Sequence, residues 1–169
     1  MKTRTSADLS PDPARDAFQL DSYMPHVLCV TSRRVSRLLS RRFADSFGLT
    51  IPEWCVLAVV GRLGTLSPSQ VGEWTGMDKV KVSRSAASLV ARGLIRQSQD
   101  PNDGRGRLLR LTRKGITAYH GTVPIARELE SSMAQSLSRT EWAAMTKVLS
   151  KINGMLEEID DPHGDVDAD

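Results

Sequence analysis

Apolar residues recur at helical spacing along most of this chain. In the segment 22–47 several apolar side chains lie at helical spacing, namely Leu28, Val35, Leu38, Leu39 and Phe43, and the segment 139–159 carries one long apolar stripe. Two short runs, 94–98 and 107–111, are predicted instead as strands, because turn-forming residues cluster between them. The predicted helices span 22–47, 52–63, 68–74, 78–92, a segment that follows Thr112 and bends at Pro124, and 139–159. The pattern therefore predicts six helices and one β-hairpin.

Three of these helix starts carry a capping box. A Ser or Thr precedes a Glu or Gln by three residues, so that each side chain bonds a free backbone N–H. The pairs are Thr50–Glu53, Ser67–Gln70 and Ser138–Glu141. Asp78 is the expected N-cap of the fourth helix, and Gly48, Gly64 and Gly93 follow the ends of predicted helices. These residues set the helix boundaries more firmly than periodicity alone would.

The formal net charge of +3 hides a strong asymmetry. Residues 79–114 hold ten basic and two acidic side chains, whereas residues 157–169 hold seven acidic side chains and no basic one. This distribution favours a surface that binds a polyanion, although a solvated basic face would have the same composition. The longest apolar run, 56–60, is far too short to span a membrane, and the N-terminal residues lack the apolar core of a signal peptide. We therefore expect a cytoplasmic protein without a membrane partner.

Residue types that catalyse reactions or bind metals are few and scattered. Cys29 and Cys55 stand alone, and no histidine lies at ligand spacing from either. No combination of Ser, His and Asp, or of Cys and His, is apparent in the sequence. We expect no metal, no cofactor and no enzymatic activity.

Residues 68–92 have the layout of a helix-turn-helix. Val71 and Trp74 are expected to pack against the second helix, called the recognition helix, and to hold its N-terminal half for a DNA major groove. Their expected partners are Val82, Ala86, Leu89 and Val90. The side chains expected to contact DNA from the two helices are Ser69, Lys79, Lys81, Ser83, Arg84 and Ser85. An ordinary helical hairpin with a charged face is the alternative.

The predicted hairpin follows the recognition helix directly, as the wing of a winged helix does. Arg105 and Arg107 lie at its tip, which has no apolar residue and so no evident role in a core. A wing places such arginines beside the minor groove, where the negative potential of DNA is strong. The fold class is therefore mainly α with a small β-hairpin wing: a winged helix-turn-helix plus a helical dimerisation region.

Three segments of the sequence resemble a known family. They are G-L-I-R at 93–96, D-P-N-D-G-R-G-R at 100–107 and L-R-L-T-R-K-G at 109–115. Together they resemble the MarR family of bacterial transcription regulators, whose pattern runs G-L-I/V, D-P-x-D-x-R and L-x-L-T-x-K-G. The resemblance implies that Asp103 pairs with a basic residue and braces the wing, while Arg105 enters the minor groove.

The resemblance also implies a homodimer in which the terminal helices of two chains interlock and two recognition helices bind pseudopalindromic double-stranded DNA. The alternative is that these apolar stripes form a bundle within one chain. The expected divisions are a disordered arm at 1–18, a MarR-like domain at 19–159 with its winged helix-turn-helix at 52–112 and dimerisation helices at 20–48 and 113–159, and a disordered acidic tail at 160–169.

Trp54 is a candidate for binding a small-molecule effector. In the family its position in the first turn of the second helix faces the first helix. Trp54 and Val30 would form an apolar slot for an aromatic ring, and Arg33, Arg34 and His26 would hold a carboxylate or phosphates. Core packing of Trp54 and a solvated arginine face are the alternatives.

The run I-P-E-W at 51–54 is similar to hydroxycinnamate-responsive members of the family. This similarity implies that the effector is a small aromatic carboxylate or its coenzyme A thioester. Trp74 and Trp142 are expected to lie in the core, since their neighbours at helical spacing are apolar.

These observations lead us to expect a ligand-responsive, sequence-specific transcriptional regulator that acts as a repressor. The main alternative is a peroxide-sensing repressor that uses Cys29, although a buried inert thiol is the simpler expectation and Tyr23 is the only tyrosine nearby. Two further classes of protein are an enzyme, which the missing catalytic motifs disfavour, and an architectural DNA-binding protein without sequence preference.

Overall fold

The computed structural model describes residues 18–101 and 106–160. The predicted disordered arm and acidic tail, apart from their residues 18 and 160, lie outside this range, and so do the predicted wing residues Asp103 and Arg105. The elements are a 3₁₀ turn at Leu20–Ser22, α1 (Met24–Phe47), α2 (Ile51–Leu63), α3 (Pro68–Thr75), α4 (Lys79–Ala91), β1 (Ile95–Gln99), β2 (Arg107–Leu111), α5 (Arg113–Gln135) and α6 (Arg139–Asp160). The six predicted helices and the hairpin are confirmed within these residues, and the 3₁₀ turn was not predicted.

The predicted caps define the helix starts. Thr50 and Glu53 form a reciprocal capping box at α2, with the Thr50 N–H donating to Glu53 Oε2 over 2.7 Å. The boxes at Ser67 and Ser138 are also formed, and Asp78 Oδ1 accepts the backbone N–H of Lys81 over 2.7 Å. Each cap satisfies backbone donors that the first helical turn leaves free.

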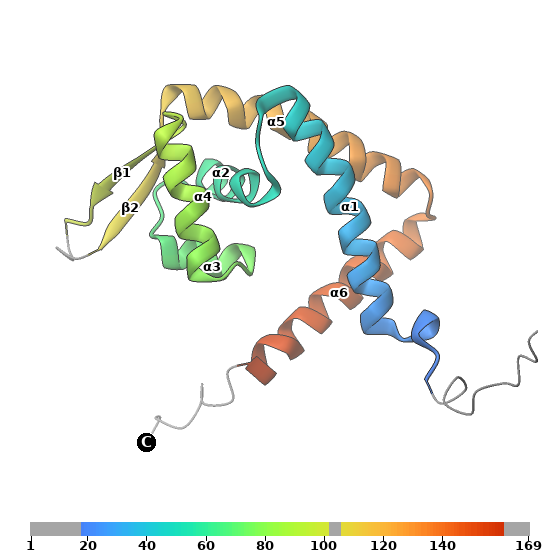
Figure 1. The fold of residues 1–169 in the computed structure, drawn as a ribbon. Coiled ribbons are helices and arrows are strands. Elements are labelled where there is room, and N and C mark those ends of the chain that lie inside the picture. Colours follow the sequence, from blue (N-terminus) through green and yellow to red (C-terminus); the bar gives the residue numbers. More distant parts are fainter. Residues whose placement is uncertain (1–17, 102–105, 161–169) are drawn as a thin grey trace, which may run out of the picture.

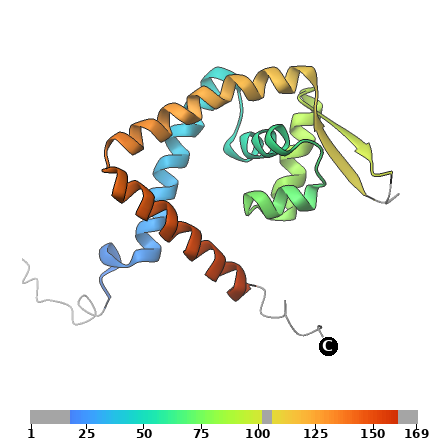
Figure 2. The ribbon, with the colours of Figure 1, turned by 180° about the vertical axis from the view of Figure 1, so that it is seen from behind.

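The buried core lies within one lobe, formed by α2, α3, α4 and the hairpin together with the adjoining ends of α1 and α5 (Figure 1). Every buried residue in the described ranges lies between Phe43 and Thr122. The largest fully buried side chains are Phe43, Leu49, Leu57, Leu89, Ile95 and Leu109. The rest of α1, the far half of α5 and α6 form an arm beside this lobe (Figure 2).

The predicted core position of Trp74 is wrong, because 57% of the residue is exposed. In α3 the side that faces α4 runs through Val71 and Gly72, and a Cβ at Gly72 would lie 3.2 Å from the Met77 carbonyl oxygen. Trp74 therefore points away from α4, and its ring lies 5.7 Å below the guanidinium of Arg62. Of the four expected partners on α4, Val82, Ala86 and Leu89 are buried, whereas Val90 is exposed.

A tight joint connects the end of α4, the hairpin and the start of α5. Thr112 Oγ1 accepts the N–H of Gly115 and donates to the Gly93 carbonyl, while the Lys114 ammonium donates to the Arg92 carbonyl. A Cβ at Gly115 would lie 1.9 Å from the Leu94 carbonyl oxygen. The residues of the L-x-L-T-x-K-G pattern are thus those that close this joint.

The arm leaves much of its apolar surface uncovered. Val148, Leu149, Met155, Leu156 and Ile159 of α6 are all at least partly exposed. Pro124 lies inside α5, which continues unbroken to Gln135.

Within the described residues no single helix has the length and apolarity to cross a membrane. Only α1 and α2 taken together reach that length and apolarity, and the two helices are bent by 77° relative to each other.

Candidate nucleic-acid interface

The N-terminal half of α4 presents a basic face to solvent. Lys79, Lys81, Ser83 and Arg84 are exposed there, as predicted. Ser85, which was also predicted to contact DNA, is instead buried and faces α2, so it does not belong to this exposed face. The buried residues of α4 are Val82, Ser85, Ala86 and Leu89, which follow the i, i+3, i+4, i+7 spacing of an inward stripe. Ser69, the other predicted contact, is exposed in the first turn of α3.

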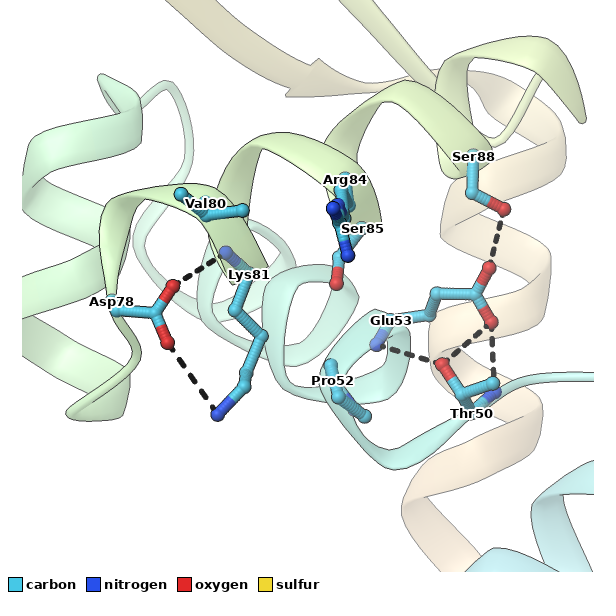
Figure 3. Close-up of a pocket in the computed structure, with 9 residues that line it drawn as sticks. All are labelled: Thr50, Pro52, Glu53, Asp78, Val80, Lys81, Arg84, Ser85 and Ser88. Carbon is cyan, nitrogen blue, oxygen red and sulfur yellow. Dashed lines mark hydrogen bonds and ion pairs between the residues drawn. The ribbon is translucent and has the colours of Figure 1, made fainter.

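A cavity of about 560 Å³ lies between this face and the start of α2 (Figure 3). Its lining is Thr50, Pro52, Glu53, Asp78, Val80, Lys81, Arg84, Ser85 and Ser88. Lys81 Nζ forms an ion pair with Asp78 Oδ2 at 3.6 Å, and both side chains are exposed. The backbone hydrogen bond from Lys81 also lowers the pKa of Asp78. An exposed pair of this kind contributes little to stability, so Lys81 can exchange Asp78 for a phosphate or a base at small cost.

Glu53 joins the recognition helix to α2 from the inside of this cavity. Its carboxylate accepts the Ser88 hydroxyl, the Thr50 hydroxyl at 2.9 Å and the Thr50 N–H at 2.7 Å. Arg92 Nη1 lies 3.8 Å from Glu53 Oε2, and its guanidinium donates to the Phe47 carbonyl at 2.6 Å and to the Gly48 carbonyl at 3.0 Å. The cluster therefore fixes α4 against both α2 and the end of α1.

Burial alone would raise the pKa of Glu53, but the hydrogen bonds from Ser88 and Thr50 and the charge of Arg92 outweigh it, and the pKa is lowered. A carboxyl whose pKa is lower in the folded than in the unfolded chain stabilises the fold fully above its ordinary value, which is 4.5. This stabilisation decreases as the pH falls below 4.5. It is lost once the pH has fallen below the lowered pKa of Glu53 in the folded state.

Glu53→Gln is expected to remove this dependence on pH. At pH 7 it should lower the free energy of unfolding by roughly 1–3 kcal/mol, because a charged acceptor of several hydrogen bonds is lost. Below pH 4.5 the difference from wild type should narrow, since Glu53 is then protonated in the unfolded chain and, at lower pH, in the folded protein as well. Urea denaturation between pH 3 and 7 measures both effects, with Glu73→Gln on the exposed side of α3 as the control. A gap between Glu53→Gln and wild type that stays constant with pH would contradict the prediction.

The hairpin is anchored at its base and carries charge on its outer face. Leu66 exchanges two backbone hydrogen bonds with Leu109, which is fully buried, and so holds β2 against the lobe. Arg96 and Arg110 pair across the strands and are both exposed. Arg107, a predicted contact, is exposed at the end of β2 nearest the turn. No ion pair neutralises these three arginines within the described residues.

A second, more apolar cavity of about 410 Å³ lies between α1, α2, α5 and α6. Its lining is Val35, Leu39, Trp54, Ala58, Arg62, Tyr119, Val123, Ala126, Arg127, Leu129, Glu130, Met133 and Trp142. Trp54 is half-buried, and its ring stacks on Phe43 of α1 with 4.8 Å between centroids. The expectation that Trp54 faces the first helix is therefore confirmed. Trp142 is also half-buried, at the edge of this cavity rather than in the main core.

The remaining predicted effector residues do not line this cavity. Val35 and Leu39 are the residues of α1 that reach it, whereas His26 lies nine residues before Val35, about 14 Å along the helix axis. Val30 also precedes the cavity. Arg33 and Arg34 are exposed on α1. The basic residues at the cavity are instead Arg62 of α2 and Arg127 of α5.

The sequence is similar to that of known DNA-binding regulators. The family model described as the MarR family matches residues 47–106, from the end of α1 into the hairpin. A curated relative, the HTH-type transcriptional repressor IacR of Pseudomonas putida, is 22% identical over 148 residues, which cover 88% of each chain. Over residues 47–106 the chain is thus similar to the MarR family.

Solved structures of transcriptional regulators share this fold. A probable transcriptional regulator from Pseudomonas aeruginosa is 29% identical with a TM-score of 0.71, over 79% of this chain and 99% of that one. Bordetella bronchiseptica BpsR, whose DNA binding is regulated by 6-hydroxynicotinic acid, is 27% identical with a TM-score of 0.74, over 80% of this chain and 96% of that one. The fold predicted from the sequence is confirmed, and the chain is similar to transcriptional regulators that share this fold.

Two further features of the structure differ from the sequence predictions. The cysteine expected to be buried, Cys29, is exposed on α1, whereas Cys55 is partly buried and its burial raises the pKa of the thiol. The Glu53 cluster was not predicted beyond its capping box. Ser88 is 35 residues away in sequence, so no local pattern could have paired it with Glu53.

Proposed function

We propose that this chain is a MarR-family regulator, a ligand-responsive repressor that binds pseudopalindromic DNA as a homodimer. The observation that carries the proposal is the exposed basic face of α4, formed by Lys79, Lys81 and Arg84 on a helix whose inner side is fixed by the core and by Glu53. A rigid helix with basic side chains on its outer face suits binding in a major groove. Its curated relative IacR is named a repressor.

The wing adds contacts outside the major groove. Arg107 is exposed at the end of β2, and Arg105, which lies outside the described residues, is assigned to the minor groove by its place in the family pattern. Asp103 is assigned by the same pattern to bracing the wing. Contacts of this kind are made to the DNA backbone or to its electrostatic potential, and they strengthen binding to all sequences alike.

Arg84→Ala is expected to change the base preference of the protein. A base contact is worth roughly 1–3 kcal/mol, so the variant should tolerate other bases at one position in each half-site. Selection of duplexes from a random library by wild type and by Arg84→Ala measures this, and Lys81→Ala is tested in the same way. Arg107→Ala is the matched control, since it should weaken binding to all sequences and reduce the salt dependence by about one unit. Identical selected sequences for wild type, Arg84→Ala and Lys81→Ala would contradict the proposal.

The proposed homodimer would cover the apolar surface of the arm. Exposed apolar side chains gather on α6, and others lie near the start of α1, where Tyr23 and Met24 are 45% and 60% exposed. Large apolar side chains at this density mark an interaction surface. In a two-fold homodimer the terminal helices of both chains would bury them together.

The proposed effector is a small aromatic carboxylate or its coenzyme A thioester, bound in the cavity beside Trp54. Trp54 and Tyr119 offer aromatic faces, and Arg62 and Arg127 can bind a carboxylate or phosphate. The related BpsR responds to 6-hydroxynicotinic acid, an aromatic carboxylate. These residues replace the arginines of α1 as the proposed anion site.

Trp54→Ala is expected to abolish release of DNA by the effector while Trp54→Phe retains it, because the ring supplies the stacking surface. Arg127→Gln should weaken the response to carboxylates. The measurement is a titration of the protein–DNA complex with benzoate, 6-hydroxynicotinate, hydroxycinnamates and their thioesters, where a coupling of about 1–3 kcal/mol gives a 5–150-fold loss of affinity. Release by peroxide alone, abolished in Cys29→Ser, would replace this proposal with the thiol sensor.

A further inference from the structure

Glu53 and Trp54 are neighbours in the first turn of α2, and their side chains contact different parts of the molecule. Trp54 reaches the cavity between the arm and the lobe and stacks on Phe43. Glu53 points toward α4 and accepts the Ser88 hydroxyl (Figure 3). One helical turn therefore contacts the proposed effector cavity on one side and the recognition helix on the other.

Trp54 and Glu53 are also connected by a second set of contacts, which runs through α1. Phe43, on which Trp54 stacks, lies one turn before Phe47, whose carbonyl accepts the Arg92 guanidinium at 2.6 Å. Arg92 follows the end of α4 and pairs with Glu53 at 3.8 Å. The two aromatic rings and the carboxylate–guanidinium pair thus join α1, α2 and α4 in one closed chain of contacts.

We propose that Glu53 is a positioning residue that couples the cavity beside Trp54 to the recognition helix through Ser88 and Arg92. This inference rests on the proposed function, since it states how effector and DNA would influence each other.

The coupling follows from the burial of the carboxylate. Glu53 is only 8% exposed, so a hydrogen bond that it loses is not replaced by water at no cost. When the first turn of α2 shifts to accommodate a ring beside Trp54, Glu53 either moves Ser88 and α4 with it or loses these bonds. Because linkage is reciprocal, DNA bound by α4 must alter the surroundings of Trp54 to the same extent.

This reciprocity allows a test that requires no effector. The full-length protein is labelled with 5-fluorotryptophan, and the ¹⁹F resonance of Trp54 is assigned from the Trp54→Phe variant. A DNA duplex selected from a random library is added to saturation, which is followed separately by anisotropy of the labelled duplex. We expect the Trp54 resonance to shift on DNA binding in wild type.

Three variants of α4 isolate the coupling. Ser88→Ala removes the donor to Glu53 and is expected to reduce the shift to less than half, whereas Ser88→Thr restores the hydroxyl and the shift. Ser85→Ala is the matched control: Ser85 also faces α2, but no hydrogen bond of its side chain appears among the described residues, so the full shift is expected. A shift that is absent in wild type, or equally large in Ser88→Ala, would overturn the inference.

These outcomes are separate from failure of the proposed function. If no compound of the panel releases DNA, the proposed effector class is wrong, while the Trp54 shift still decides whether Glu53 couples the two sites. If selection yields no preferred sequence, specific recognition is wrong, and the shift is then measured with the random duplex pool.

Discussion

Gly115→Ala is expected to destabilise the protein by about 3 kcal/mol, the upper part of the range for overpacked sites. The added Cβ would lie 1.9 Å from the Leu94 carbonyl oxygen and 2.9 Å from the carbonyl carbon, distances that no side-chain rotation relieves because both atoms are backbone. The same carbonyl accepts the N–H of Thr112 at 3.0 Å, so moving it breaks the joint. The intrinsic preference of a helix for Ala over Gly, about 0.5–1 kcal/mol, acts in the opposite direction and is too small to compensate.

Urea denaturation followed by circular dichroism measures this loss. Gly154→Ala is the matched control, since it makes the same change within α6, where a Cβ would meet no atom within 4 Å. That variant is expected to be as stable as wild type or slightly more stable. Equal stabilities for Gly115→Ala and wild type would show that α5 does not approach Leu94 this closely.

Leu149→Lys combined with Leu156→Lys is expected to convert the dimer into a folded monomer. These side chains are 39% and 51% exposed in the single chain, so charged replacements cost little there and much in an interface that buries them. Light scattering should give a mass near 18.6 kDa for the variant and twice that for wild type. Affinity for a two-half-site duplex should fall by at least two orders of magnitude, because one chain contacts only one half-site.

The control for this experiment places two lysines on the polar side of the same helix. Thr146 and Ser150 are exposed and donate only to carbonyls of α6, so Thr146→Lys with Ser150→Lys should leave the dimer intact. A monomeric wild-type protein, or a dimeric Leu149→Lys, Leu156→Lys variant, would contradict the proposed assembly.

The sequence predicted those parts of the fold that depend on neighbouring residues. Capping boxes and helix-ending glycines are local, so the helix boundaries were placed to within about two residues. The side chain of Trp74 was misplaced because α3 has only two turns, too few for periodicity to identify the inward side. Close approach of α3 to α4 at Gly72 decides that side, and it depends on tertiary packing.

The parts of the candidate site formed by one element were largely predicted, whereas those formed by several elements were largely missed. The exposed basic residues of α4 follow from one helix, whereas the contact of Gly115 with Leu94 spans the whole hairpin. The residues around the apolar cavity come from four helices, and the angles between those helices determine that Arg127 reaches it and Arg33 does not. A sequence pattern contains no information about such angles.

Confinement of the buried core to residues 43–122 divides the chain into parts of unequal local stability. The lobe contains a complete set of mutually buried side chains and can act as one cooperative unit, so its amide hydrogens should exchange only on global unfolding. In a single chain α6 lacks such packing, and its amides should exchange through local opening at little cost in free energy. Association of two chains would then supply much of the ordering of α6, so the persistence of that helix would depend on protein concentration.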